Sequence, residues 1–312
     1  MRALACPASL KGVLAAPVAA AALAEGMRAG GAEAVELPVA DGGEGTAEVL
    51  QLALGGDWRT AEVHDAFGRP RPARWLLLPD GTAVVESAAA VPLDPERLDP
   101  LAASSRGYGE LVAAALAERP AALLLCLGGT ATMDAGAGLL EVVGELPVPT
   151  RVACDVTATL LDAPRTFGPQ KGAAPAEVAE LERRFAARTE LVLFQHKLRG
   201  GAAGGLGAAL CSLGAELVPG AAFVLDAVGF DASGYDLVVT GEGRVDATTA
   251  LGKAPGEVAR RCAGTRCVVF GGIVEAEVPG VETIALSGHP QRAQDDLFDL
   301  GRRLASDWHQ TR

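Results

Sequence analysis

The fold is decided by residues 35–46, VELPVADGGEGT, an apolar run that ends in a glycine-rich loop. Before this segment come a short apolar run, Ala3–Cys6, and an alanine-rich segment, residues 17–28, that ends at a pair of glycines. A second helical pattern follows over residues 47–54. The order strand, helix, strand, loop and helix predicts a parallel sheet whose functional loops lie at the carboxyl ends of the strands.

Three segments near the end of the chain have the same strand-loop-helix pattern: residues 236–240, 267–270 and 282–286. Because the first 54 residues supply only two strands, we expect them to share one sheet with these three. Residues 58–86 have a different pattern, in which short alternating segments are separated by turn residues. The sequence therefore predicts an α/β protein with a discontinuous domain of residues 1–54 and 230–312 and an inserted α/β domain of residues 55–229.

The composition favours a globular protein with two cores. The chain has 312 residues, 49% of them apolar, and a formal charge of −12 without a basic cluster, so we expect no nucleic-acid partner. The six cysteines are scattered without a Cys-x-x-Cys pair, which predicts neither a zinc site nor a disulfide framework. No apolar run approaches the ~18 residues of a membrane span. We therefore predict a cytoplasmic protein with reduced cysteines and no membrane association.

The apolar strand 122–127 leads into residues 128–138, GGTATMDAGAG. Such a loop can turn backbone N–H groups toward a phosphate, and the dipole of a following helix adds positive potential. Its spacing is neither that of the GxxxxGK[ST] loop nor that of GxGxxG. A plain tight turn remains the alternative.

Acidic residues accompany two further glycine loops. In residues 41–46, DGGEGT, Asp41 and Glu44 can hold a metal-bound triphosphate or accept a hydroxyl proton, whereas capping of the next helix by Glu44 and Thr46 is the alternative. Residues 240–246, TGEGRVD, repeat this pattern ahead of Lys253, and a solvated loop with surface ion pairs is the alternative. A run of glycines at residues 200–207 precedes another predicted helix.

Lysine usage points to glycine-containing loops as well. The chain has four lysines among 27 basic residues, and Lys11, Lys171 and Lys253 each stand next to a glycine, in the segments 9–12, 167–172 and 251–253. A compact ammonium suits phosphate oxygens, so we interpret these lysines as ligand-binding residues. With so few lysines, chance is the alternative. Asp155, after the strand 151–154, adds one more acid.

These motifs resemble the glycerate kinase family of the bacterial glycerate-pathway type. The matching segments form one collinear series: residues 9–12, 40–46, 85–90, 107–111, 128–138, 154–156, 167–173, 201–207, 236–246 and 252–254. The resemblance implies phosphorylation of D-glycerate by ATP with Mg²⁺, usually at the 2-hydroxyl to give 2-phosphoglycerate. It also implies two α/β domains, one of them Rossmann-like and discontinuous, with the active site in the cleft between them.

Mapped onto this sequence, the resemblance implies a site that draws on Lys11, Asp41, Glu44, Asp134, Asp155, Lys171, Glu242, Asp246 and Lys253. We assign their roles from chemistry: Lys11 and Lys253 would neutralise phosphate charge, Asp41 or Asp246 would hold the metal, and Asp155 would act as base. Lys171 would bind the substrate carboxylate. Predicted to bind substrate are Ser9, Glu44, Lys171, Glu242 and Lys253, and predicted to bind the nucleotide are Gly128, Gly129, Thr130, Thr132, Asp134 and Gly136.

Two positions depart from the family pattern. Ala8 stands where the family usually carries Asp, and Ala158-Thr159 stands where it carries Asn-Pro. A weakened nucleotide and hydroxy-acid binding module of the same fold is therefore the alternative to a kinase. A dehydrogenase is disfavoured because no GxGxxG follows the first strand. The substrate is expected to be a small molecule, and the sequence leaves the oligomeric state open, a homodimer included.

Overall fold

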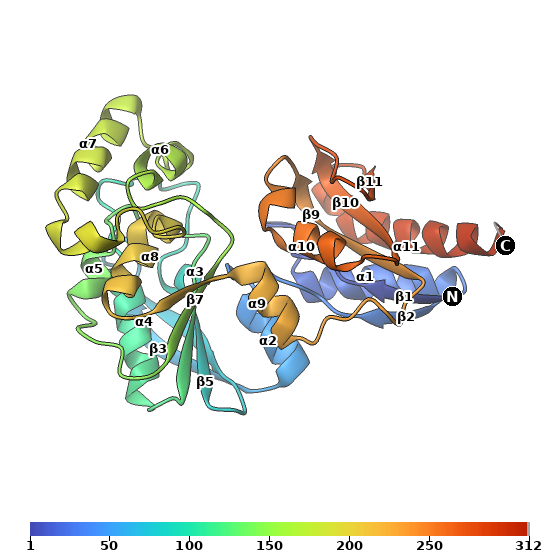
Figure 1. Cartoon of the computed structure of the whole chain (residues 1–312), viewed down its shortest axis with the longest axis horizontal. Coiled ribbons are helices and arrows are strands. Elements are labelled where there is room, and N and C mark those ends of the chain that lie inside the picture. The colour runs from blue at the N-terminus through green and yellow to red at the C-terminus, as the bar shows by residue number, and fades with distance from the viewer. Residues whose placement is uncertain (311–312) are drawn as a thin grey trace. The chain divides into compact units, whose positions relative to one another are not determined.

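The computed structural model describes residues 1–310, apart from the side chains of residues 251, 309 and 310. The chain divides into two compact units (Figure 1). Unit 1 contains Met1–Asp41, Glu48–Ala53 and Ala221–Arg312, and unit 2 contains Gly42–Ala47 and Leu54–Gly220. Each unit is built on its own sheet, so the predicted α/β class is confirmed.

Unit 1 holds a five-stranded sheet in the order β11-β10-β9-β1-β2. All of its neighbouring strands pair in parallel. The strands are β1 (Arg2–Ala5), β2 (Glu33–Glu36), β9 (Leu237–Val245), β10 (Arg266–Val274) and β11 (Glu282–Ala285). The two N-terminal strands thus share a sheet with the three C-terminal ones, as the sequence predicts.

Helices cover both faces of this sheet because side chains alternate along each strand. Ala3, Ala5 and Val239 pack on one face under α1 (Ala16–Ala29) and α11 (Ala293–Gln310). Leu4 and Val238 pack on the other face, against α9 (Gly220–Ala227) and α10 (Ala254–Arg261). The remaining elements of this unit are α2 (Thr46–Leu54), most of which belongs to it, and the 3-10 helices η3 (Thr249–Leu251) and η4 (Pro290–Arg292).

Unit 2 holds a six-stranded sheet in the order β3-β4-β5-β6-β7-β8. β3, β4 and β5, which are separated by turn residues, pair antiparallel, and β5 to β8 pair in parallel. The strands are β3 (Asp57–His64), β4 (Pro70–Leu77), β5 (Thr82–Glu86), β6 (Ala122–Cys126), β7 (Thr150–Cys154) and β8 (Glu216–Pro219).

The helices of unit 2 form two groups. α4 (Arg106–Ala117) and α8 (Ala202–Ser212) pack on the sheet in one core, together with the buried Trp75 and Tyr108. A smaller core joins the segments around α6 and α7. The other helical elements are α3 (Ser87–Ala90), α5 (Ala137–Leu140), α6 (Ala163–Phe167), η1 (Pro169–Lys171), α7 (Pro175–Ala186) and η2 (Thr189–Phe194).

The compact units differ from the predicted domain boundaries at Leu54, which belongs to unit 2, and in two longer segments. Residues 221–229 belong to unit 1, because Ala221 and Leu225 of α9 pack on its sheet. Residues 42–47 belong to unit 2, where a Cβ at Gly42 would lie 2.8 Å from the Cβ of Ala153 in β7. Both differences arise because tertiary packing, rather than the local pattern, assigns these short segments.

Candidate active site

A charged cluster follows strand β9 in unit 1. Lys253 Nζ lies 3.7 Å from a carboxylate oxygen of Glu242 and 3.6 Å from one of Asp246. The hydroxyl of Thr249 donates to Glu242 at 2.7 Å and accepts from the backbone N–H of Asp246 at 3.1 Å. Three residues predicted from the sequence therefore come together, and Thr249 is a fourth that the sequence reasoning missed.

The pKa values of the two acids in this cluster are shifted in opposite directions. Burial raises the pKa of Glu242 above its usual value, and the nearby carboxylates of Asp41 and Asp246 act in the same sense, against Lys253 and Thr249. Hydrogen bonds from Thr248 and the charge of Lys253 lower the pKa of Asp246. Asp246 is thus held in its ionised form, as a cation ligand must be.

Other predicted residues of unit 1 lie on loops at the same edge of the sheet. The loop after β1 is tied to β9 because the N–H of Ala8 donates to the carbonyl of Gly241 at 2.9 Å. A Cβ on Gly243 would lie 3.4 Å from the backbone nitrogen of Lys11, so this loop and β9 approach closely. Ser9 is half-buried in this loop, and Lys11 is exposed.

In unit 2, the glycine loop after β6 lies against the segment around Glu44. A Cβ on Gly128 would meet the Cα of Gly43 at 2.9 Å, and one on Gly129 would meet a carboxylate oxygen of Glu44 at 3.0 Å. Gly129 also has φ +67°, a conformation that glycine adopts readily. Gly128, Gly129 and Glu44 therefore meet at one place in the folded chain.

Lys171 joins this loop from η1. Its side chain is buried, and its ammonium donates to the carbonyl of Thr132 at 2.9 Å and to the hydroxyl of Thr130 at 3.4 Å. A buried ammonium is costly unless it is held by such acceptors. The structure thus brings three more predicted residues together in unit 2.

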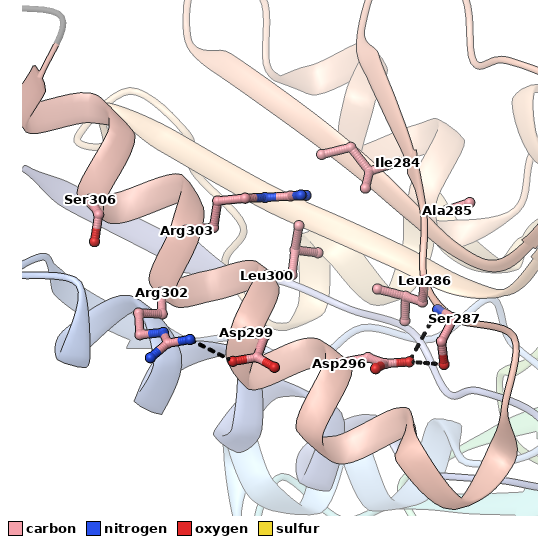
Figure 2. A pocket seen from close by; sticks show the side chains of 10 residues that line it. All are labelled: Ile284, Ala285, Leu286, Ser287, Asp296, Asp299, Leu300, Arg302, Arg303 and Ser306. Carbon is pink, nitrogen blue, oxygen red and sulfur yellow. Dashed lines mark hydrogen bonds and ion pairs between the residues drawn. The ribbon is translucent and has the colours of Figure 1, made fainter.

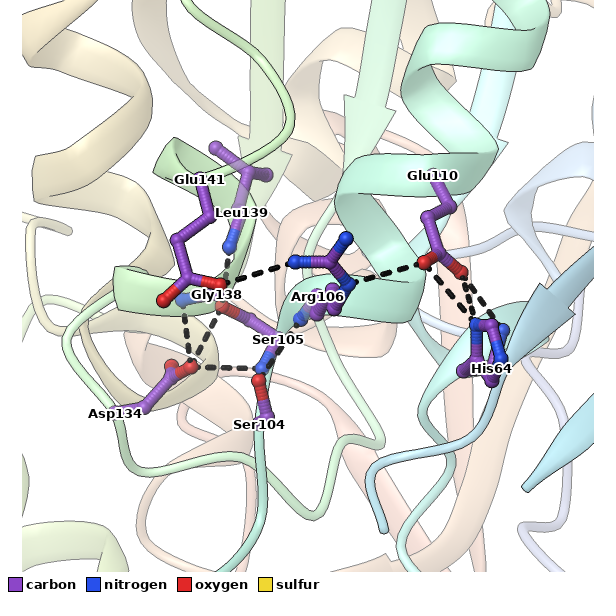
Figure 3. A network of polar contacts seen from close by, with 9 residues as sticks. All are labelled: His64, Ser104, Ser105, Arg106, Glu110, Asp134, Gly138, Leu139 and Glu141. Carbon is purple, nitrogen blue, oxygen red and sulfur yellow. Dashed lines mark hydrogen bonds and ion pairs between the residues drawn. The ribbon is translucent and has the colours of Figure 1, made fainter. Parts of the chain in front are cut away.

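The carboxylate of Asp134 stabilises the loop itself through hydrogen bonds. It accepts hydrogen bonds from the N–H and hydroxyl of Ser105 at 2.7 and 2.8 Å and from the N–H of Gly138 at 3.1 Å (Figure 3). It also accepts from the N–H of Gly136 at 3.1 Å. The Ser105 hydroxyl in turn accepts from the N–H of Leu139 at 3.0 Å. These bonds tie the end of the loop to the start of α4. No pattern in the sequence links Ser105 to an acid 29 positions later.

Gly136 is likewise engaged in packing. It has φ +70°, and a Cβ there would lie 2.3 Å from the Cβ of Ala209 in α8. The glycines of α8 also face this loop, since a Cβ on Gly204 would meet the carbonyl oxygen of Thr132 at 1.9 Å. Ala203, Gly204 and Gly205 have positive φ values that interrupt α8 with a kink. The run at residues 200–207 therefore lies at this kink, ahead of most of the regular turns of the helix, and it allows the close approach of two backbones.

The start of α2 does not show the capping expected of Thr46. The Thr46 hydroxyl is buried and has no hydrogen-bond partner among the described residues. The N–H of Ala47 instead donates to the carboxylate of Glu86 at 2.7 Å. The Thr46 hydroxyl therefore does not cap α2.

The segment after β7 carries Asp155 and one of the two departures from the family pattern. Asp155 is half-buried directly after the strand. The hydroxyl and N–H of Thr159 donate to the carboxylate of Asp162 at 2.6 and 3.1 Å. These bonds lower the pKa of Asp162 and fix the turn where the family carries proline.

A separate pocket lies between the end of β11 and α11 (Figure 2). Its polar side chains are largely paired with each other, as in the bonds of Arg302 to Asp299 and of Ser287 to Asp296. None of the predicted site residues lines it. We therefore place the candidate site on the loops and not in this pocket.

The acids of unit 1 fit a metal ion that is shared with phosphate. Within residues 1–310 there is no group of three or more His, Cys, Asp or Glu residues arranged as a protein-only metal site. Mg²⁺ commonly takes only one or two carboxylates and completes its shell with phosphate oxygens and water. Asp41 and Asp246, which both act on Glu242, have the required hard oxygen donors.

The sequence model of the glycerate kinase family matches residues 3–148 and 146–291. The chain belongs to the glycerate kinase family. Among its relatives, glycerate 2-kinase of Escherichia coli K12 is 36% identical over 82% of this chain and 80% of its own length. Glycerate kinase of Bacillus subtilis 168 is 37% identical over 83% of this chain and 81% of its own.

A solved structure has the same fold over the whole chain. The crystal structure of a Salmonella typhimurium LT2 protein assigned as glycerate kinase 2 superposes with a TM-score of 0.80 at 31% identity. The superposition covers 100% of this chain and 99% of the Salmonella chain. The protein is therefore an enzyme of this kinase family. Of its helices within residues 1–310, none is both long and apolar enough to traverse a lipid bilayer.

Proposed function

We propose that the protein transfers the terminal phosphoryl group of ATP to the 2-hydroxyl of D-glycerate, giving 2-phosphoglycerate and ADP. The names of its relatives support the acceptor. The observation that carries the proposal is the cluster after β9, where Lys253 lies between Glu242 and Asp246. Phosphoryl transfer needs a cation beside the phosphate oxygens and carboxylates that hold magnesium, and this cluster has both kinds of group.

In this proposal, the residues of unit 1 bind the triphosphate of ATP and its metal ion. Asp41 and Asp246 would hold Mg²⁺, which when bound neutralises charge on the phosphate oxygens. Lys253 and Lys11 would add positive charge beside those oxygens. Glu242 keeps Lys253 in place through their ion pair, so it acts on phosphate through that lysine.

The residues of unit 2 serve the acceptor and the nucleotide loop. The Lys171 ammonium would pair with the carboxylate of glycerate, and Asp155 would accept the proton of the attacking hydroxyl. The O–H bond then breaks as the new O–P bond forms, and the bond to the leaving ADP oxygen breaks. The N–H groups of Gly128 and Gly129 would face phosphate, while Asp134 holds the loop in shape.

A coupled assay of ADP release over a panel of small hydroxy acids tests the proposal. D-Glycerate should be turned over with a kcat/KM at least about tenfold above that of L-glycerate, lactate and glycolate, a difference of ~1.4 kcal/mol. Binding of ATP or glycerate without ADP release would favour the non-catalytic module suggested by Ala8. Equal turnover of every acid in the panel would refute glycerate as the substrate.

A further inference from the structure

Two cysteines of unit 1 lie beside each other behind α10. Cys262 follows the last residue of the helix as its C-terminal cap, and its carbonyl accepts a hydrogen bond from the N–H of Thr265 at 2.9 Å. This tight turn leads the chain into β10, whose second residue is Cys267. Both side chains pack in one apolar cluster with Cys6.

The thiols of Cys262 and Cys267 are hydrogen-bonded to each other, and this bond makes them unequal. The bond from Cys267 lowers the pKa of Cys262. The same bond and burial raise the pKa of Cys267. Because the thiolate is the nucleophilic form, Cys262 is the sulfur that attacks, and Cys267 keeps its proton until a later step.

The pair is reached from solvent through a surface pocket. Both cysteines line it, together with Arg266, Val281 and Glu282. Their exposed fractions are small, 3% for Cys262 and 6% for Cys267, whereas Cys6 is completely buried. These two cysteines therefore lie at the wall of a surface pocket, and the third sulfur of the cluster is shielded.

We propose that Cys262 and Cys267 form a redox-active dithiol that small organic disulfides oxidise to an intramolecular disulfide. The Cys262 thiolate attacks one sulfur of the reagent, a mixed disulfide forms, and one thiolate leaves. The Cys267 sulfur then loses its proton and attacks the Cys262 sulfur, which releases the second thiol. Two protein thiols are oxidised and one reagent disulfide is reduced to two thiols.

Oxidised glutathione is a suitable probe for the folded, full-length chain. After brief exposure, the protein is denatured, its free thiols are blocked by alkylation and it is digested with trypsin. Cleavage after Arg261 and Arg266 places the two cysteines on different peptides. We expect these peptides to be joined by a disulfide, while the other four cysteines are alkylated. Six alkylated cysteines, or a disulfide that involves Cys6, would overturn the proposal.

Single variants test the order of attack. Cys267→Ser should stop at a glutathione adduct on Cys262, formed at least about tenfold faster than any adduct on Cys267 in Cys262→Ser. Cys211→Ser is the matched control: Cys211 is also buried, but its thiol donates to the carbonyl of Ala215, so its removal should leave the disulfide yield unchanged. Equal adduct rates in the first two variants, or a lost disulfide in the control, would contradict the assigned roles.

Discussion

The loops after β9 and β6 have similar compositions, since each combines glycines with acidic residues, yet they use their acids differently. After β9, the side chains of Glu242, Asp246 and Lys253 are 14%, 28% and 22% exposed and form an open ionic cluster. After β6, Asp134 accepts four hydrogen bonds from the protein itself. An acid in a glycine loop therefore belongs to a partly exposed ionic cluster in one case and supports the loop structure in the other, and its partners decide which.

The sharpest test of this difference is Gly136→Val in the β6 loop. The substitution forces a branched side chain into a positive φ and against Ala209, so we expect the free energy of unfolding to fall by about 2–5 kcal/mol. Urea denaturation measures the change. The control is Gly144→Val, where a Cβ meets nothing within 4 Å and stability should change little. Equal effects at both positions would remove the packing role of Gly136.

Ser105→Ala tests the support of Asp134. The buried hydroxyl makes two hydrogen bonds, and its loss leaves the N–H of Leu139 without that acceptor, so we expect a loss of about 2 kcal/mol in unfolding free energy. KM for ATP should rise as the loop loosens. The exposed Ser233, which also donates to an aspartate, is the matched control. A stable variant with a parental KM would show that the loop holds its shape without Ser105.

Lys253→Arg tests the chemical role of the β9 loop. A guanidinium is broader than an ammonium and aims its donors differently, so we expect kcat to fall at least about tenfold, or ~1.4 kcal/mol of transition-state stabilisation. Lys11→Arg should behave in the same way. Lys197→Arg, at an exposed site outside the glycine loops, should retain the parental kinetics. Retention of parental kcat and KM by the first two variants would assign these lysines to the solvated surface.

The smallest effect concerns the pH dependence of stability. Because the folded protein raises the pKa of Glu242, ionisation of this group destabilises the fold as pH rises through the folded pKa. Glu242→Gln should therefore gain stability relative to the parent as pH rises from the ordinary glutamate pKa of about 4.5 through the raised pKa of the folded state. Glu257 is the control of opposite sign: hydrogen bonds donated by Arg260 lower its pKa, so the stability deficit of Glu257→Gln should shrink as pH falls through that lowered pKa. If the unfolding free energies of both variants followed the parent's pH dependence, the assigned directions of the two pKa shifts would be wrong.

The sequence predicts the sheet of unit 1 well because its strands are continuous apolar runs followed by glycine loops. It also identifies most residues that the structure brings together, such as Lys171 with Thr130 and Thr132. The orientation of Asp134 could not be predicted, since its partner Ser105 belongs to a different element. The packing of Gly136 on Ala209 could not be predicted from the sequence for the same reason. Local patterns reveal which residue types a loop carries, and tertiary contacts decide where each one points.

The position of the new phosphate ester tests the account most directly. The protein is incubated with ATP, Mg²⁺ and D-glycerate, and the product is then given to enolase alone. If phosphate is transferred to the 2-hydroxyl, phosphoenolpyruvate should form at once, with an amount equal to the ADP released. A signal that appears only after phosphoglycerate mutase is added would place the phosphate on the 3-hydroxyl and contradict the proposed reaction.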